Sequence, residues 1–205
     1  WLTTVGIYPS EVHENQFGWS ESSKMLIMPI IDTDGSVRAW QGRNFRLKQT
    51  PLPDYRGSPT VSQHEKGYIV QRDGPKYLTG GSIGDILPVF KKDSIVHKFN
   101  DTIVACEGIL DAIKISRVLA GTPLLGSHMP LGRVTLASKR FKRLGVWLDP
   151  DKRVEAVKLA LRASQIMPTF VVMSDKDPKE YGINDIYEFI DMSSDSFDVD
   201  KIEQV

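Results

Sequence analysis

Acidic residues follow three apolar runs in the second half of the chain, and their spacing suits metal chemistry. The runs cover residues 102–106, 144–148 and 169–173. Two acids follow each run within a few positions: Glu107 and Asp111, Asp149 and Asp151, and Asp175 and Asp177. If the runs are neighbouring parallel strands, their carboxyl ends share one edge of the sheet, where ligands of open α/β sheets bind. We therefore expect these side chains to converge.

Converging carboxylates repel one another and take up protons unless a cation neutralises them. Oxygen ligands favour Mg²⁺ or Mn²⁺, and Mg²⁺ takes only one or two protein carboxylates directly, leaving positions for water and phosphate oxygens. This pattern indicates phosphoryl chemistry, in which such ions activate a hydroxyl and stabilise charge on the transferred phosphorus. The alternative for Asp111, Asp175 or Asp177 taken singly is a helix cap or a turn residue.

The elements that would position these acids form a regular alternation from Asp101 onward. The expected strands are 102–106, 123–126, 144–148 and 169–173, and the expected helices are 109–120, 131–140, 152–165 and 184–190. Alternating strands and helices with short connections predict a mostly parallel sheet with helices on both faces. The fold class is therefore α/β.

The first half of the chain predicts a smaller α+β subdomain. A short helix is expected at 9–15, two strands at 24–31 and 37–45 around a turn at 32–35, an extended loop at 47–67 and a short strand at 68–71. We therefore divide the chain into an N-terminal subdomain, residues 1–100, the α/β domain, residues 101–191, and an acidic tail or linker, residues 192–205.

Composition limits the classes of function. The 205 residues are 40% hydrophobic, and the formal net charge is +0. The charges are nevertheless unevenly distributed along the chain. Residues 36–98 hold 11 Lys or Arg against 5 Asp or Glu, whereas residues 174–205 hold 10 acids against 3 bases. The single cysteine, Cys106, excludes a disulfide or a cysteine-based zinc site within this chain and indicates a cytoplasmic setting. No apolar run approaches the roughly 20 residues that span a bilayer, and because the first residue is Trp1 we expect neighbouring domains.

The Glu-Gly-x-x-Asp run that begins at Glu107, followed 42 residues later by Asp-x-Asp, resembles the TOPRIM domain of bacterial-type primases, topoisomerases and some nucleases. The resemblance covers roughly residues 100 to 190. It implies that Glu107, Asp149 and Asp151 are the catalytic residues around magnesium, and that Asp111 and Asp177 belong to the same metal set.

Three further segments resemble the RNA polymerase core of bacterial or phage primases. They are the strand pair 25–45, which ends in Gly-Arg-Asn-Phe, the run Pro-Lys-Tyr-Leu at 75–78, and Lys-Asp-Pro-Lys-Glu at 176–180. Residues 6–19 resemble the phage branch. The resemblance implies that Arg43 and Lys76, together with Lys91 and Lys92, line a groove for template and nucleotide phosphates, in keeping with the basic surplus of this half.

The chain departs from the primase pattern at two places. Lys152, Arg153 and Val154 follow Asp-x-Asp where the family has a small pair, and Lys179 stands where the late motif has a second acid. The late motif therefore offers fewer metal ligands here than in the family.

The primase reading implies Mg²⁺ or Mn²⁺ as cofactor, single-stranded DNA template and ribonucleoside triphosphates as partners, and a helicase and a zinc-binding template-reading domain elsewhere, in the cytoplasm of a bacterial or phage-infected cell. Two alternatives remain open. A TOPRIM nuclease would use the same carboxylates to cleave a strand, and a non-catalytic TOPRIM module would only bind nucleic acid or a partner. No phosphate-binding loop of the Gly-x-x-x-x-Gly-Lys-Ser/Thr type is present, so a helicase motor is not part of this chain.

Overall fold

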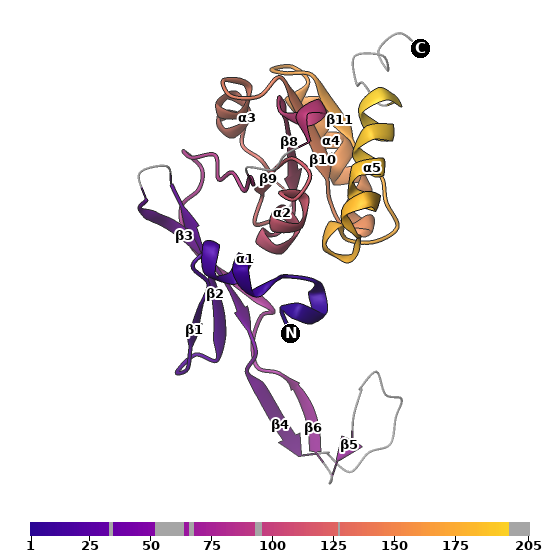
Figure 1. Cartoon of the computed structure of the whole chain (residues 1–205). Coiled ribbons are helices and arrows are strands. Elements are labelled where there is room, and N and C mark those ends of the chain that lie inside the picture. The colour runs from indigo at the N-terminus through magenta and orange to yellow at the C-terminus, as the bar shows by residue number, and fades with distance from the viewer. Residues whose placement is uncertain (33–34, 52–63, 66–67, 93–95, 127, 197–205) are drawn as a thin grey trace.

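The computed structural model describes residues 1–32, 35–51, 64–65, 68–92, 96–126 and 128–196. Figure 1 shows a sheet covered by helices, an antiparallel part that carries the N-terminus, and a pair of long strands that extends away from both. The α/β class with a smaller N-terminal α+β part is therefore confirmed.

The main sheet consists of four parallel strands in the order β11-β10-β8-β9. Their bounds are Thr102–Cys106 for β8, Ala120–Pro123 for β9, Arg143–Trp147 for β10 and Thr169–Val171 for β11. All residues of β8 are buried. Strands covered on both faces need apolar side chains on both, which explains the continuous apolar runs in the sequence.

Helices cover both faces of this sheet. Helices α3 (Leu131–Ser138) and α4 (Arg153–Ala163) pack on the face that carries Ile103 and Val146. Helices α2 (Ile109–Ile115) and α5 (Ile183–Ser196) pack on the opposite face, against Trp147. The described residues also form four short 3₁₀ turns, η1 (Thr3–Val5), η2 (His97–Phe99), η3 (Pro150–Lys152) and η4 (Pro178–Glu180).

The N-terminal part is a four-stranded antiparallel sheet with helix α1 (Pro9–Glu14) beside it. Its strands are β1 (Gly18–Ser20), β2 (Met25–Ile31), β3 (Val37–Asn44) and β7 (Tyr77–Gly81), in that order. The hairpin of β2 and β3 was expected and is confirmed. Because Met28, Ile30 and Ala39 share a core with Ile109 and Ile113 of α2, the two parts pack directly on each other.

The expected loop at 47–67 is partly wrong. Residues Leu47–Pro51 form β4, which pairs with β6 (Tyr68–Arg72), and β6 also pairs with the short β5 (His64–Glu65). Residues 52–63 and 66–67 of that expected loop lie outside the described residues. Figure 1 shows β4 and β6 extending away from the body.

Two helix lengths differ from expectation. Helix α2 ends at Ile115 instead of 120, and the chain enters β9 at Ala120, three residues earlier than predicted. A side chain at Gly121 would meet the backbone of Ala112, so the glycine permits β9 to lie against α2. Helix α5 continues to Ser196, so the first residues of the expected tail are helical, and residues 197–205 lie outside the described part.

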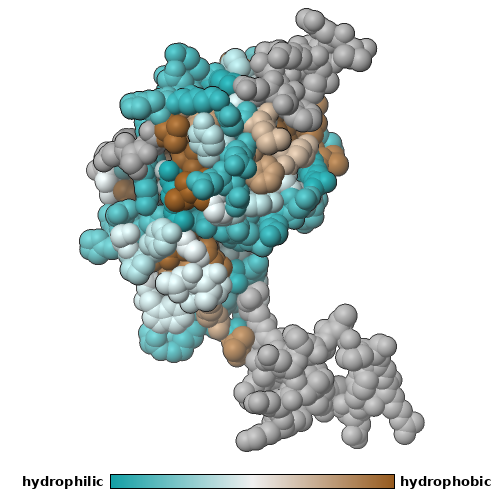
Figure 2. All heavy atoms as spheres, turned by 45° about the vertical axis from the view of Figure 1, so that its right-hand side comes forward, coloured by the Kyte–Doolittle hydropathy of each residue, from teal (hydrophilic) through white to brown (hydrophobic). Residues whose placement is uncertain are grey.

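The surface in Figure 2 is mostly hydrophilic over the described body, with hydrophobic groups gathered in small areas. Among the helices of the described residues, none has both the length and the apolar character that crossing a bilayer requires.

Candidate active site

The carboxyl ends of β8 and β10 form the topological switch point of the main sheet. These strands are neighbours, with Cys106 opposite Trp147. The chain leaves β8 through α2 to β9 on one side, and it leaves β10 through α4 to β11 on the other side. Diverging connections open a crevice, and open α/β sheets bind ligands there.

A pocket of about 340 Å³ lies at this edge, between the two parts of the molecule. Glu107, Asp111, Asp149 and Asp177 line it from the main sheet. Residues of the antiparallel sheet line it from the other side, namely Gln41, Tyr77 and Thr79, together with Lys76, which directly precedes β7. Four of the five predicted metal ligands thus line one pocket, together with one predicted phosphate-binding lysine.

Asp149 directly precedes the 3₁₀ turn η3 and makes no side-chain capping hydrogen bond with it. Its Oδ1 atom is buried and has no hydrogen-bond partner among the described residues. Burial, followed by the charges of Glu107 and Asp111, raises the pKa of the Asp149 carboxyl to about 7. A carboxylate held this way gains by binding a cation.

Glu107 follows β8 and has one engaged and one unengaged oxygen. Its Oε1 accepts a hydrogen bond from Nζ of Lys152 at 2.5 Å, whereas its Oε2 is buried and has no partner among the described residues. The backbone of Glu107 is held by the residue that follows β9 and Leu124: the N–H of Leu125 donates a hydrogen bond to the Glu107 carbonyl oxygen at 2.9 Å.

Asp111 and Asp177 share a different cation, the ammonium group of Lys179. Asp111 lies in the first turn of α2 and is 4% exposed, and burial raises its pKa despite the nearby charge of Lys179. Its Oδ1 lies 3.5 Å from Nζ of Lys179 and also accepts the Lys179 backbone N–H at 3.1 Å. The same ammonium contacts Oδ2 of Asp177.

These donors fit a hard divalent ion bound by a small number of protein ligands. Glu107 and Asp149 each offer a buried oxygen that no other described residue engages, which suits Mg²⁺ or Mn²⁺ held by one or two carboxylates. Within the described residues, no three His, Cys, Asp or Glu side chains are grouped closely enough to hold a metal alone. Water and substrate phosphates would therefore complete the coordination.

Asp151, the third predicted catalytic carboxylate, has a different position. It lies within η3, is exposed, and is not among the residues that line the pocket. Proline at position 150 starts this 3₁₀ turn directly after Asp149, so the backbone does not stay extended, and only Asp149 of the pair lines the pocket.

The two predicted basic residues of the antiparallel sheet lie next to the pocket. Lys76 is exposed and lines it. Arg43 lies opposite Tyr77 in the sheet, donates to the Tyr77 hydroxyl at 2.8 Å, and stacks its guanidinium 4.3 Å from the ring centre of Trp1. Arg43 does not line the pocket but contacts a residue that does.

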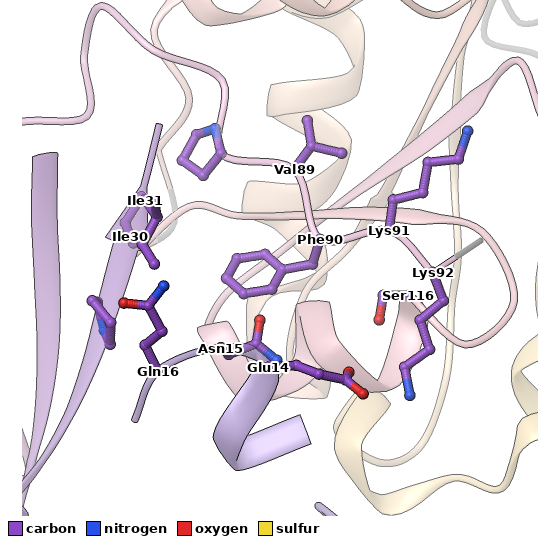
Figure 3. A pocket seen from close by; sticks show the side chains of 12 residues that line it. Glu14, Asn15, Gln16, Ile30, Ile31, Val89, Phe90, Lys91, Lys92 and Ser116 are labelled. Atoms are coloured by element: carbon purple, nitrogen blue, oxygen red, sulfur yellow. The ribbon is translucent and has the colours of Figure 1, made fainter. Parts of the chain in front are cut away.

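Lys91 and Lys92 line a separate pocket of about 380 Å³, shown in Figure 3. Their side chains point in opposite directions there, and the ring of Phe90 points toward Ile30 and Ile31. Lys92 lies 2.9 Å from Oε1 of the buried Glu11. The structure thus places these lysines apart from the carboxylates.

Some residues in or next to the pocket could not be found from motif spacing. Lys152 and Lys179 stand out in the sequence only as departures from the primase pattern, and the structure turns both ammonium groups onto carboxylates of the site. Gln41 is 8% exposed, and nothing in the sequence marks it, because β3 also contains the polar residues Arg38, Arg43 and Asn44.

Comparison with solved structures shows the same fold in primases. The chain is similar to the Aquifex aeolicus primase, zinc-binding and RNA polymerase domains, with a TM-score of 0.62 and 17% identity over 94% of this chain and 54% of that one. It is similar to the primase fragment of the bacteriophage T7 primase-helicase, with a TM-score of 0.56 and 15% identity over 94% and 73%. A DnaG primase catalytic domain bound to single-stranded DNA gives a TM-score of 0.53 and 14% identity over 94% and 62%.

The chain therefore has the fold of primase catalytic domains, and it spans about half the length of the Aquifex aeolicus chain. Neither the scan against protein-family models nor the search of curated proteins found a match.

Proposed function

We propose that this chain is the catalytic core of a DNA primase, which synthesises short RNA primers on single-stranded DNA by divalent-metal-dependent nucleotidyl transfer. One observation carries the proposal. In a primase-like fold, Glu107 and Asp149 each present a buried oxygen that has no partner among the described residues, at the switch point of the sheet and in a pocket that Lys76 also lines.

The reaction forms a bond between the primer 3′-hydroxyl oxygen and the α-phosphorus of the incoming triphosphate, breaks the bond to the pyrophosphate oxygen, and releases the hydroxyl proton to water. Glu107 and Asp149 would hold a Mg²⁺ or Mn²⁺ ion. The ion supplies hydroxyl activation and neutralisation of phosphate charge. Asp111 and Asp177 also line this side of the pocket, and we call the four carboxylates of Glu107, Asp111, Asp149 and Asp177 the acidic wall. Asp151 would act from outside the pocket.

The opposite wall of the pocket suits phosphates and template. Lys76 is exposed at the pocket, and its ammonium group can bind phosphate oxygens as a point charge. The guanidinium of Arg43, which contacts the Trp1 ring and the Tyr77 hydroxyl, would bind a nucleic-acid strand beside the pocket. Lys91 and Lys92 would contact template farther away, in the pocket of Figure 3.

The proposed partners are single-stranded DNA and ribonucleoside triphosphates, with a zinc-binding domain and a helicase acting beside this core. The likeness to a DnaG domain bound to single-stranded DNA supports the first, and the likeness to a phage primase-helicase fragment supports the last. The similarity to a chain that combines zinc-binding and RNA polymerase domains supports the zinc-binding partner.

A second candidate is a non-catalytic module that binds nucleic acid without turnover. The observation that favours it is the pairing of Lys152 with Glu107 and of Lys179 with Asp111 and Asp177, because these ammonium groups already neutralise part of the acidic wall. A catalytic site is also compatible with these ion pairs, so a measurement of activity must separate the two candidate functions.

The test incubates the purified chain with end-labelled single-stranded DNA, Mg²⁺ and ribonucleotides, alongside Glu107→Gln. Newly formed short RNA supports a primase, and shortening of the labelled DNA supports a nuclease. Intact DNA without any new RNA supports the binding module. We expect Glu107→Gln to reduce primer synthesis by at least about 100-fold, which corresponds to ~2.7 kcal/mol of transition-state stabilisation.

Asp175→Asn is the matched control, because Asp175 lies in the loop that also carries Asp177 but is exposed and pairs with Arg153 outside the pocket. It should retain activity. Full primer synthesis by Glu107→Gln, with folding verified by circular dichroism, would contradict the assignment of Glu107.

A further inference from the structure

Lys179 is held in place among the carboxylates and does not extend freely from the surface. It belongs to η4, whose first residue, Pro178, is buried. Its backbone N–H donates to Oδ1 of Asp111 at 3.1 Å, and its ammonium group lies 3.5 Å from the same oxygen. The ammonium also contacts Asp177, and the Lys179 side chain is only 21% exposed. Both the main chain and the side chain of Lys179 therefore bind the acidic wall.

The four carboxylates of the pocket consequently fall into two pairs. Asp111 and Asp177 are engaged by Lys179. Glu107 and Asp149 retain one buried oxygen each without a partner among the described residues. Lys152 reaches Glu107 through one oxygen only, from a side chain that is 30% exposed, and it leaves the second oxygen of Glu107 unengaged.

A count of formal charges also favours a single divalent cation. Four carboxylates face three ammonium groups, those of Lys76 and Lys179 in the pocket lining and that of Lys152 on Glu107. The formal net charge is therefore minus one, and two divalent cations would bring it to plus three in a partly buried site, which is unfavourable.

We infer that the site takes one divalent cation, at Glu107 and Asp149, and that the ammonium group of Lys179 occupies the place of a second cation between Asp111 and Asp177. In this arrangement Asp111 anchors η4 to α2 and does not ligate metal. The inference rests on the proposed function for the identity of the ion. It goes beyond that function by specifying how many ions bind and what Lys179 does.

The experiment counts Mn²⁺ ions by electron paramagnetic resonance, following the loss of the free-ion signal on titration of the full chain. Wild type should bind one ion. Lys179→Met frees two carboxylates and makes the pocket more negative, so it should bind two. Lys179→Arg keeps the charge and should bind one, and Lys176→Met, which alters an exposed lysine of the same loop, should also bind one.

Two ions in wild type, or a single ion in a folded Lys179→Met, would overturn the inference while leaving the proposed function intact. No binding by wild type would remove the metal site and with it the proposed function. If Lys179→Met fails to fold, Asp177→Asn decides instead: it should leave Mn²⁺ affinity unchanged, and a loss of binding would overturn the inference.

Discussion

Asp149 combines burial with two neighbouring negative charges, and its carboxyl has a pKa of about 7. In the unfolded chain the same group titrates near its ordinary value of 3.8. Between these values the folded protein binds more protons than the unfolded chain, so this residue makes the folded state less stable as pH rises through that range. Such a cost is typical of a group placed for function.

The first prediction follows from this cost. Asp149→Asn removes the ionisable group, and Oδ1 has no hydrogen bond within the described residues to lose. The substitution should therefore stabilise the metal-free protein at pH 8 by about 1–2 kcal/mol after allowance for solvent screening. The gain should shrink as pH falls and vanish near pH 4. Urea unfolding of both proteins between pH 4 and pH 8 measures it.

If both proteins are equally stable at pH 8, or if Asp149→Asn is less stable than wild type across the whole pH range, the electrostatic origin of the destabilisation is contradicted. Adding Mn²⁺ provides a control at the same residue. It should stabilise wild type and leave Asp149→Asn unchanged, because binding of a ligand to the folded state raises its stability.

The carboxylates of the site were predictable at the residue scale, but their partners were not. Glu107 and Asp149 directly follow apolar runs, so their place at the sheet edge depends on local pattern alone. Lys152 and Lys179 carry long side chains whose direction is set by tertiary packing, in this case by η3 and η4. The 3₁₀ turn after Asp149 could not be inferred from an Asp-x-Asp spacing, so the position of Asp151 outside the pocket lining was not predictable.

At the scale of elements, apolar strands were easier to recognise than glycine-containing ones. The expected strands of the main sheet were found near their predicted positions because both of their faces are buried. Strand β7 was missed because it contains Gly80 and Gly81, which weaken a strand pattern. Gly80 lies opposite Trp40, and a side chain there would meet the indole ring, so the glycine is a requirement of pairing.

Helix α1 is joined to the end of α2 by a buried ion pair. Glu11 is 0% exposed and accepts hydrogen bonds from Nε and Nη2 of Arg117 at 2.8 and 2.6 Å. Burial alone would raise its pKa, but the hydrogen bonds from Arg117, from the Tyr8 backbone and from Lys92 outweigh burial and lower the pKa to about 2. The carboxylate therefore stabilises the folded state in its charged form.

The second prediction concerns this link between helices. Glu11→Ala leaves the guanidinium of Arg117 buried without its partner and should lower the free energy of unfolding by about 3–5 kcal/mol. Because the folded pKa lies below the ordinary value of 4.5, the contribution of Glu11 is present above that value and is lost as pH falls toward about 2. Urea unfolding at pH 7 and at successively lower pH measures both effects.

Glu14→Ala is the control on the same helix, because Glu14 is exposed. It should change stability by less than about 0.5 kcal/mol. A similar loss for both variants would show that helix α1, not the ion pair, is the source of the effect.

At the scale of the whole molecule, the pocket exists only because the two parts pack against each other. Strand β3 and the residues around β7 supply one wall, and the ends of β8 and β10 supply the other. Sequence patterns predicted both parts, but the packing of α2 against β2 and β3 depends on long-range contacts that local periodicity does not contain. The matches of the strand pair 25–45 and of Pro-Lys-Tyr-Leu to primases were the sequence signals that linked the first half to the acidic site.

The third prediction asks which basic residues bind template near the carboxylates. Lys76 lines their pocket, whereas Lys91 lines a different one. Lys76→Ala should weaken binding of labelled single-stranded DNA and reduce the salt dependence of log K by about 0.7, the value for one phosphate contact. Lys91→Ala should have a smaller effect, and fluorescence anisotropy at several salt concentrations measures both.

Each variant removes one positive charge, so a purely nonspecific effect of charge would weaken DNA binding equally in both. A difference between the two variants therefore reports the position of the lysine. Competition with a ribonucleoside triphosphate in the presence of Mg²⁺ sharpens the comparison. If Lys76 contacts phosphates beside Glu107 and Asp149, triphosphate should compete with DNA for wild type and for Lys91→Ala, and much less for Lys76→Ala. Equal competition in all three proteins would assign the phosphate contact to another residue.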